Sequence, residues 1–321
     1  MSETVLSLLK GADNIISGQE ISDRLGLSRA GVWKKILLLR NKGYVIEALP
    51  AKGYRLISAP DLAEDYLRLQ MRSDLWKDVV VHDAVESTND LAMTLATKGG
   101  VASGTVLLAD RQTRGKGRLG RVWESPAGTN IYMSLVIRPE LQPKETTMLT
   151  VLAAVAGALA LQRACNIPVS IKWPNDLVIG RRKLGGILTE VRADPDRVAV
   201  AVIGIGINVN IDFRDLPGAI RDIATSVKIE TGINHSRNKI IIQLLREFEH
   251  WYTVLKKEGK RPLLEAWREN SSTLGRKISV VMSDATWSGI AEDIDDYGML
   301  MLKMRSGERK TISSGDISFL S

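Results

Sequence analysis

The chain has 321 residues, of which 44% are hydrophobic and 25% charged, as in a soluble globular protein of two or three domains. Its formal net charge of +7 favours an anionic partner such as nucleic acid or a nucleotide. A single cysteine excludes an internal disulfide framework and fits a reducing compartment. Three scattered histidines have no metal-ligand spacing, so we expect no metal bound by the protein alone.

The start of the chain, Met1-Ser2-Glu3, lacks the basic residues and apolar run of a signal peptide. The longest uncharged window, residues 146–162, is rich in alanine, and we expect it to be too short and too weakly apolar to span a bilayer. It predicts a buried helix instead. We therefore expect a cytoplasmic protein with no membrane partner.

The first sixty residues predict a winged helix-turn-helix domain. Ser17 and Glu20 form a capping box at the start of one helix, and Ser28 caps the next. The second of these helices ends near a glycine, after which two short apolar runs surround a turn and form the wing. The expected helices are 4–10, 18–25 and 29–41, and the expected strands are 44–49 and 54–57.

Positive charge is concentrated in the third helix and the wing. From Ser28 to Leu56, seven lysine and arginine side chains stand against one carboxylate, Glu47, a net charge of +6. Contact with DNA phosphates requires such a concentration. The residues we expect to bind DNA are Ser28, Arg29, Trp33, Lys34, Lys35, Lys52 and Arg55. A winged helix used for protein docking or dimerisation is the alternative.

Beyond a linker near Ala59-Pro60-Asp61, short strands follow one another closely while helices stand apart. This order predicts an α+β domain with a mixed sheet over residues 61–271, and not a doubly wound fold. We expect strands at 79–82, 105–110, 131–137, 169–172, 177–179, 187–192 and 198–208, and helices at 89–98, 145–164 and around 240–255.

Residues 111–123 form the most unusual stretch, with five cationic side chains and three glycines in thirteen residues. Glycines let a backbone approach a ligand closely, and the cations suit a phosphate or carboxylate. The run Gly115-x-Gly117-x-x-Gly120 also matches a dinucleotide-binding pattern, but no helix follows it. A solvated basic loop is the other alternative. We expect the segment to be mobile when empty and ordered by a ligand.

Four further stretches place polar chemistry beside strand ends. Ser87-Thr88-Asn89 begins a helix, where ordinary N-capping is the alternative. In Lys172-Trp173-Pro174-Asn175-Asp176 the proline keeps Trp173 extended and presents three polar side chains together, unless this is a plain turn. Lys183 precedes two glycines, where a backbone can approach an acyl group. Gly204-x-Gly206-x-Asn208 weakens a strand unless something lies close to its surface.

Together these stretches resemble biotin protein ligases, and with the winged helix they resemble the bifunctional bacterial form that also represses the biotin operon. The matching segments are Ser87-Thr88-Asn89, Gln112 with the loop to Arg121, the stretch 172–176, Lys183-Leu184-x-Gly186-Ile187-Leu188, and Gly204-x-Gly206-x-Asn208. They occur in the family's order, and the resemblance covers essentially the whole chain.

The resemblance implies a central domain like that of class II synthetases, and a two-step reaction. Biotin is activated by ATP, with Mg²⁺, to biotinoyl-5′-adenylate. Biotin then passes to a lysine of a biotin carboxyl carrier protein. The adenylate-bound form would dimerise and repress biotin genes at an operator.

The resemblance also implies residue roles. Lys183, Arg118 and Asp176 would be catalytic. Biotin would be held by Ser87, Thr88, Asn89, Gln112, Gly115, Lys116, Gly117, Arg118, Lys183, Gly186, Leu188, Gly204 and Gly206. ATP or the adenylate would be held by Arg118, Arg121, Trp123, Lys172, Asn175, Asp176, Lys183 and Asn208. One departure is Lys116, where many relatives carry arginine.

The end of the chain, residues 272–321, predicts short strands and, by the resemblance, a small SH3-like β-barrel. The alternatives for the whole chain are a biotin-sensing repressor without ligase activity, a lipoate or octanoate transferase, and a ligase whose winged helix no longer binds DNA. Retention of Arg118, Lys183 and Asp176 argues against the first alternative.

Overall fold

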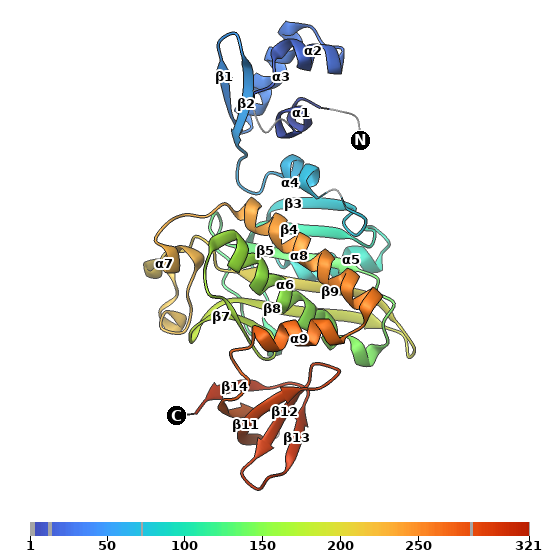
Figure 1. Ribbon diagram of the computed structural model, residues 1–321, viewed down its shortest axis with the longest axis vertical. Helices are drawn as coiled ribbons and strands as arrows, with labels where there is room; N and C mark the ends of the chain where they lie inside the picture. Colours follow the sequence, from blue (N-terminus) through green and yellow to red (C-terminus); the bar gives the residue numbers. More distant parts are fainter. Residues whose placement is uncertain (1–3, 12–14, 72, 283–284, 321) are drawn as a thin grey trace. The chain divides into compact units, whose positions relative to one another are not determined.

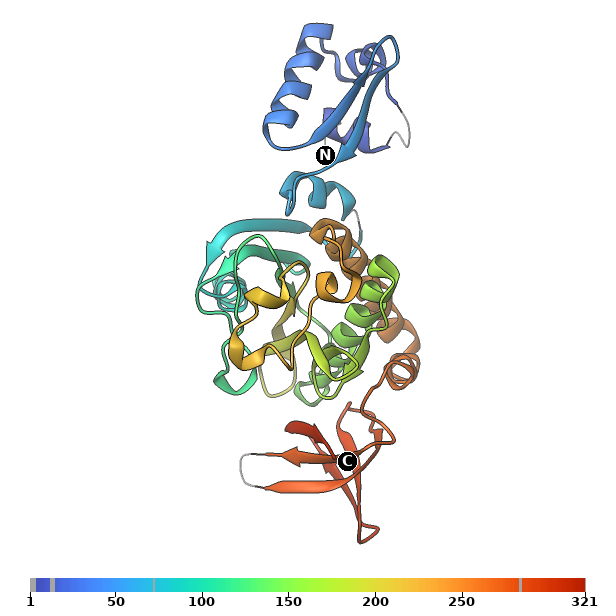
Figure 2. The same cartoon turned by 90° about the vertical axis from the view of Figure 1, so that its left-hand side faces the viewer.

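The computed structural model describes residues 4–11, 15–71, 73–282 and 285–320. Internal contacts divide the chain into two compact units, residues 1–72 and 73–321. Figures 1 and 2 show the elements of each unit from two directions. The expected domain limits at residues 60 and 271 stay predictions.

The first unit is a helix-turn-helix with a β-hairpin, as predicted. Its elements are α1 (Val5–Gly11), α2 (Gly18–Leu25), α3 (Arg29–Asn41), β1 (Val45–Leu49), β2 (Gly53–Ser58) and α4 (Glu64–Gln70). Both predicted caps are present, because the Ser17 and Ser28 hydroxyl oxygens accept from the N–H groups of Glu20 and Gly31. Helix α4 was not predicted, and its N-cap Ala63 makes no side-chain hydrogen bond.

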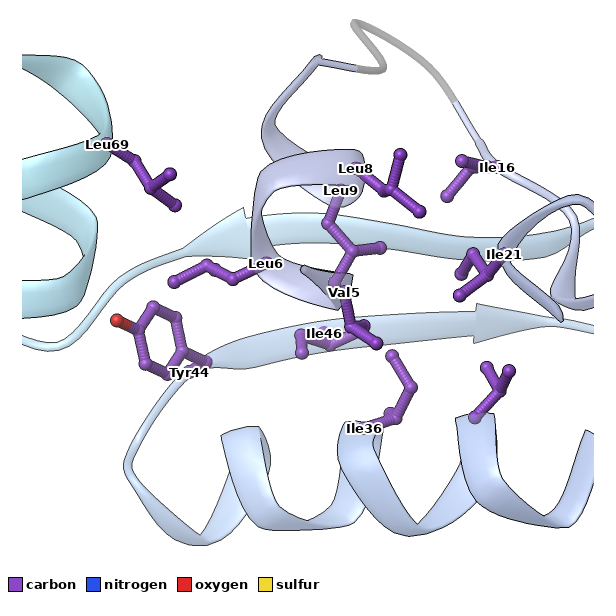
Figure 3. Packing of buried hydrophobic residues seen from close by; sticks show 11 residues of the cluster. Val5, Leu6, Leu8, Leu9, Ile16, Ile21, Ile36, Tyr44, Ile46 and Leu69 are labelled. Carbon is purple, nitrogen blue, oxygen red and sulfur yellow. The ribbon is translucent and has the colours of Figure 1, made fainter. Parts of the chain in front are cut away.

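A small apolar core holds the first unit together. Side chains from α1, α2, α3 and the hairpin meet in it, and Leu69 of α4 joins the same cluster (Figure 3). Ile21 and Ile36 are almost completely buried at the centre. The core therefore fixes α3 while leaving its opposite face exposed.

The second unit is built on a seven-stranded mixed sheet, as predicted. Its order is β3-β4-β5-β9-β8-β7-β6, in which only β3 and β4 are parallel. The strands are β3 (Asp78–Val85), β4 (Thr105–Gln112), β5 (Ile131–Ile137), β6 (Ser170–Lys172), β7 (Asp176–Ile179), β8 (Arg182–Ala193) and β9 (Val198–Ile207).

Helices cover both faces of this sheet. Helix α5 (Thr88–Thr97) packs on one face against β4, β5 and β9. On the other face lie α6 (Thr147–Cys165), α8 (Arg237–Glu258) and α9 (Arg261–Glu269), with α6 between the sheet and α8 (Figures 1 and 2). Neither α9 nor the short α7 (Val227–Thr231) was predicted.

The predicted buried helix is α6, but the expectation that it is too short and too weakly apolar to span a bilayer was wrong. Among the described residues, the segment Pro143–Cys165 alone is long and apolar enough to cross a membrane, and 72% of its apolar window is buried inside the protein. Most of its side chains are buried against the sheet and α8, so its apolar composition is that of a core helix.

The C-terminal residues form a five-stranded antiparallel sheet of order β13-β12-β11-β10-β14. The strands are β10 (Lys277–Val281), β11 (Thr286–Ile294), β12 (Leu300–Met304), β13 (Arg309–Ile312) and β14 (Asp316–Phe319). Within the described residues no pairing joins the edge strands β13 and β14, so the sheet is open where a closed barrel was expected.

Candidate functional site

A cavity of about 620 Å³ opens on the α5 side of the central sheet. It is lined by every residue that the sequence predicted to hold biotin or ATP except Gly115. These residues come from the start of α5, the basic loop, β8, β9 and the turn between β6 and β7. The tertiary structure therefore brings all five sequence motifs to one site, although their individual roles stay predictions.

At one part of the cavity, the start of α5 is hydrogen-bonded to the end of β4. Gln112 Oε1 accepts from the backbone N–H of Thr88 at 2.8 Å and from its hydroxyl at 3.1 Å. The Gln112 amide donates to Ser125 Oγ at 3.0 Å. Ser87 caps α5, so the N-capping that was the alternative reading of this stretch is also present, beside the cavity.

The two glycines of β9 make room for two side chains. A Cβ at Gly204 would lie 2.3 Å from Oδ1 of Asn89, and one at Gly206 would lie 2.7 Å from Cε2 of Trp123. The strand therefore does have neighbours close to its surface, as its glycines indicated. Asn89 also donates to the carbonyl of Leu188 at 3.1 Å, which ties α5 to β8.

The predicted catalytic side chains lie beside one another. Lys183 Nζ is 2.6 Å from Asp176 Oδ1 and 5.5 Å from the ring centroid of Trp123. Arg118 donates to Asn175 Oδ1 at 3.0 Å, and Asn175 in turn donates to the Ile187 carbonyl at 2.6 Å. The 172–176 stretch, which contains a cis Trp173-Pro174 bond, thus places Asp176 beside Lys183 and Asn175 beside Arg118.

The C-terminal sheet contributes a carboxylate to this cationic region. Asp316 at the start of β14 is ion-paired with Arg121 of the basic loop. Burial is the main cause that lowers the pKa of Arg118 and of Lys172, while Asp316 and Asp176 oppose that shift at both. Partly desolvated cations gathered in one cavity favour a polyphosphate ligand.

Three predicted site residues also have structural partners. Asn208 donates to the carbonyl of Thr225 at 3.0 Å and is buried at the end of β9. Lys116 is ion-paired with Asp90. Gly115 does not line the cavity. It lies against the backbone of the same loop, where a Cβ would be 2.2 Å from the carbonyl oxygen of Trp123. Its glycine is required for packing within the loop.

A further segment, which was not predicted from the sequence, also lines the cavity. It carries Ile211, Leu216, Pro217, Ala219, Ile220, Ile223 and Ala224, between β9 and α7. Two backbone hydrogen bonds attach it to the site. The N–H of Lys183 donates to the carbonyl oxygen of Ile223 at 2.7 Å, and the N–H of Thr225 donates to the carbonyl oxygen of Lys183 at 2.8 Å. Its apolar residues around a Pro-Gly pair were the available signal. Asn130, Tyr132 and Asp316 were missed as well.

All seven residues predicted to bind DNA are exposed in the first unit. Ser28 caps α3, Arg29 donates to Gln19 Oε1 at 3.1 Å, and Arg55 is ion-paired with Glu47 at 2.6 Å. Trp33 is 55% exposed on the same helix as Lys34 and Lys35. The exposed face of α3 is thus both cationic and aromatic.

Across the described part of the chain, no group of three or more His, Cys, Asp or Glu side chains is placed to hold a metal ion. The oxygen-bearing side chains that line the cavity among the predicted nucleotide residues are Asn175, Asp176 and Asn208.

Three family models match the chain. They are described as the biotin/lipoate A/B protein ligase family over residues 81–208, an HTH domain over 2–55, and the biotin protein ligase C terminal domain over 273–320. A biotin protein ligase from Aquifex aeolicus, solved in complex with biotin and ATP, has a TM-score of 0.65 and 29% identity. It covers 76% of this chain and 99% of its own.

Curated relatives match over nearly the full length. The bifunctional ligase/repressor BirA of Bacillus subtilis is 40% identical over 99% of this chain and 98% of its own. The protein of the same name from Escherichia coli is 32% identical over 95% of this chain and 93% of its own. With its helix-turn-helix, ligase and C-terminal regions in the same order, the chain belongs to the BirA family of bifunctional ligase/repressors.

Proposed function

We propose that this protein activates biotin with ATP to biotinoyl-5′-adenylate and transfers biotin to a specific lysine of a biotin carboxyl carrier protein. One observation carries the proposal: a single cavity holds the Thr88–Gln112 hydrogen-bonded pair, the Lys183–Asp176 ion pair and the cations Arg118, Arg121 and Lys172. The match to a biotin ligase solved with biotin and ATP supports the same assignment.

In the first step, a carboxylate oxygen of biotin attacks the α-phosphorus of ATP. The bond from that phosphorus to the bridging oxygen breaks, and pyrophosphate leaves. Lys183 and Arg118 would stabilise the negative charge that develops on the acyl and phosphoryl oxygens. Mg²⁺, when bound with ATP, supplies further charge neutralisation, and Asn175 and Asp176 would be the oxygen donors beside it.

In the second step, the neutral amine of the acceptor lysine attacks the acyl carbon of the adenylate. The carbon–oxygen bond to AMP breaks, and the amine gives up a proton to water as the amide forms. Asp176 would orient this amine, because its carboxylate is held at the site by Lys183. Trp123 and the Gly186, Gly204 and Gly206 backbones would enclose the ligand.

The first unit would add transcriptional regulation. The adenylate-bound form would dimerise and pair two winged helices on a two-fold operator of biotin genes. The cationic, exposed face of α3 and the relatives named as ligase/repressors support this second activity.

Mass spectrometry of a purified carrier domain tests the enzymatic part, after incubation with this protein, biotin and Mg-ATP. We expect one added biotinoyl mass, lost with Lys183→Ala and retained with Lys256→Ala, the same change on exposed α8 surface. Tight biotin binding without transfer would favour a sensor-repressor. Absence of biotin binding would overturn the assignment of the cavity.

A further inference from the structure

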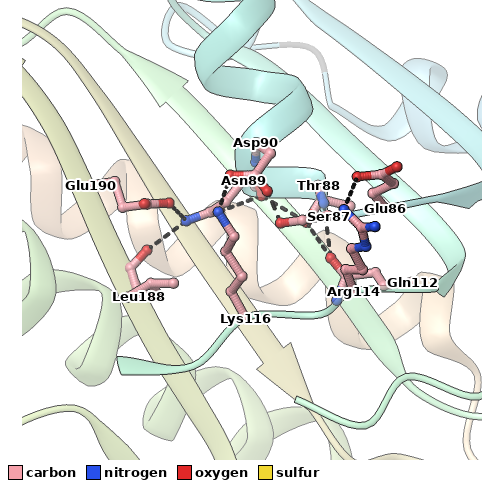
Figure 4. A network of polar contacts seen from close by, with 11 residues as sticks. Glu86, Ser87, Thr88, Asn89, Asp90, Gln112, Arg114, Lys116, Leu188 and Glu190 are labelled. Carbon is pink, nitrogen blue, oxygen red and sulfur yellow. Dashed lines mark hydrogen bonds and ion pairs between the residues drawn. The ribbon is translucent and has the colours of Figure 1, made fainter. Parts of the chain in front are cut away.

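Lys116, at the middle of the basic loop, is attached to helix α5. Its ammonium is ion-paired with Asp90, 26 residues earlier in the chain (Figure 4). The Asp90 hydrogen bond is the largest cause that raises the pKa of Lys116, so the ammonium stays charged at neutral pH. The two side chains are 46% and 45% exposed, so solvent and salt reach the pair.

The backbone of Asp90 is held in the first turn of α5. Asp90 is the third residue of α5, and its N–H donates to the capping hydroxyl of Ser87 at 3.4 Å. A carboxylate in the first turn of a helix is stabilised by the helix dipole. Glu190 on β8 accepts from Asn89 at 2.8 Å and adds attraction for Lys116 (Figure 4).

The loop is also anchored on either side of Lys116. Before it, Gln112 bonds to Thr88, and Arg114 is ion-paired with Glu86 at 3.4 Å. After it, Arg118 bonds to Asn175. Lys116 and Gly117 line the cavity between these anchors, whereas Asp90 does not line it. The Asp90–Lys116 pair thus attaches the middle of the loop to α5 beside the ligand space.

We propose that the Asp90–Lys116 ion pair is a latch that holds the loop across the Ser87–Asn89 side of the cavity and slows the escape of bound biotin. The inference rests on the proposed function, since biotin is the ligand retained. A ligand enclosed by Lys116 and Gly117 leaves only when this part of the loop moves, and that movement separates the pair. Asp90 is a positioning residue, which acts through Lys116.

The test is the dissociation rate of labelled biotin from the full chain, chased with unlabelled biotin at low salt. Asp90→Asn keeps the size of the side chain and removes the charge. We expect about two- to fivefold faster dissociation, the usual effect of losing one exposed ion pair. Lys116→Gln should give a similar acceleration, and the double variant should be no faster than either single one. Lys116→Arg, which keeps the charge, should retain the slow rate.

Salt provides a second readout that a purely structural role would not change. The difference between the native protein and Asp90→Asn should vanish near 1 M salt, where the screening length is about 3 Å. The matched control is Asp65→Asn, which breaks an exposed ion pair with Lys42 at 3.0 Å in the first unit. Its dissociation rate should equal that of the native protein.

Two outcomes separate the latch from the function on which it rests. The latch alone would be refuted if the native protein binds biotin but the biotin dissociation rate is unchanged in Asp90→Asn and Lys116→Gln. It would also be refuted if the effects of the two substitutions on that rate were fully additive. Native protein that binds no biotin would instead refute the proposed function. Should Asp90→Asn fail to fold, the Lys116→Gln and Lys116→Arg comparison decides the question.

Discussion

The carboxamide of Asn89 lies directly against the backbone of Gly204. Asn89 Oδ1 accepts from Ser134 Oγ at 2.6 Å, and its Nδ2 donates to Glu190 at 2.8 Å and to the Leu188 carbonyl. A Cβ at position 204 would be 2.3 Å from that Oδ1. The glycine is therefore required by a buried polar side chain that joins α5 to three strands.

Gly204→Ala should destabilise the second unit and weaken biotin binding. The added methyl group displaces Asn89 from its hydrogen bonds, and overpacking of this kind costs about 1–3 kcal/mol. Denaturant unfolding and biotin titration measure the two effects. Gly100→Ala is the control, because its Cβ would meet Leu95 at an ordinary 3.5 Å. Equal stability of both variants would contradict the close contact.

Asp316→Asn should lower the KM for ATP while leaving biotin affinity unchanged. The Asp316 carboxylate neutralises Arg121 and lies near Arg118 and Lys172, so its loss leaves more positive charge for a triphosphate. We expect about a two- to fivefold decrease, since the groups are partly exposed. Steady-state kinetics at varied ATP measure it.

Glu292→Gln serves as the control for this substitution, because Glu292 pairs with Arg309 within the C-terminal sheet and does not line the cavity. It should leave the KM for ATP unchanged. A raised KM in Asp316→Asn would mean that Asp316 holds the loop in a productive position and does not compete with the phosphates.

The single cysteine, Cys165, should react with thiol reagents only after unfolding. Its side chain is buried at the end of α6, and burial raises the pKa of its thiol from 9.0 to about 11. The unfolded thiol therefore ionises first as pH rises. Its contribution to the free energy of unfolding is absent below about pH 9 and destabilising between 9 and 11, by up to about 3 kcal/mol.

The measurement compares the pH dependence of unfolding for the native protein and Cys165→Ala. The variant should lose less stability between pH 9 and 11, whereas tyrosines such as Tyr44, whose pKa is raised to about 12, act equally in both proteins. If the stability of the two proteins changed equally between pH 9 and 11, the pKa of the Cys165 thiol would not be raised by burial.

Lys34→Ala should weaken DNA binding uniformly across sequences and leave biotin transfer intact. Each phosphate contact contributes about −0.9 to the slope of log affinity against log salt, so one lost contact should reduce the slope by about that amount. Fluorescence anisotropy on a duplex at several salt concentrations measures it. Lys256→Ala, on the exposed surface of α8, is the control and should leave the slope unchanged. If Lys34→Ala also left it unchanged, Lys34 would not contact a phosphate.

The sequence by itself determined the local features of this protein. Short windows predicted the caps at Ser17 and Ser28, the positions of the strands of the mixed sheet and the buried α6. They depend on neighbouring hydrogen bonds and on periodicity, which such windows contain. The order of the five motifs likewise identified the family. The helices α4 and α9 were missed because they lack the capping side chain that marked α2 and α3. Helix α7 was missed because it has only five residues.

Only the tertiary structure decided which side chains meet. Gly204 accommodates Asn89, Lys116 pairs with Asp90, and Arg121 pairs with Asp316, which is 195 residues away in the chain. A charge or a glycine in the sequence indicates that a partner or a close approach exists, but not which one. That choice is made by strand order and by packing on the sheet, which bring distant segments to one cavity.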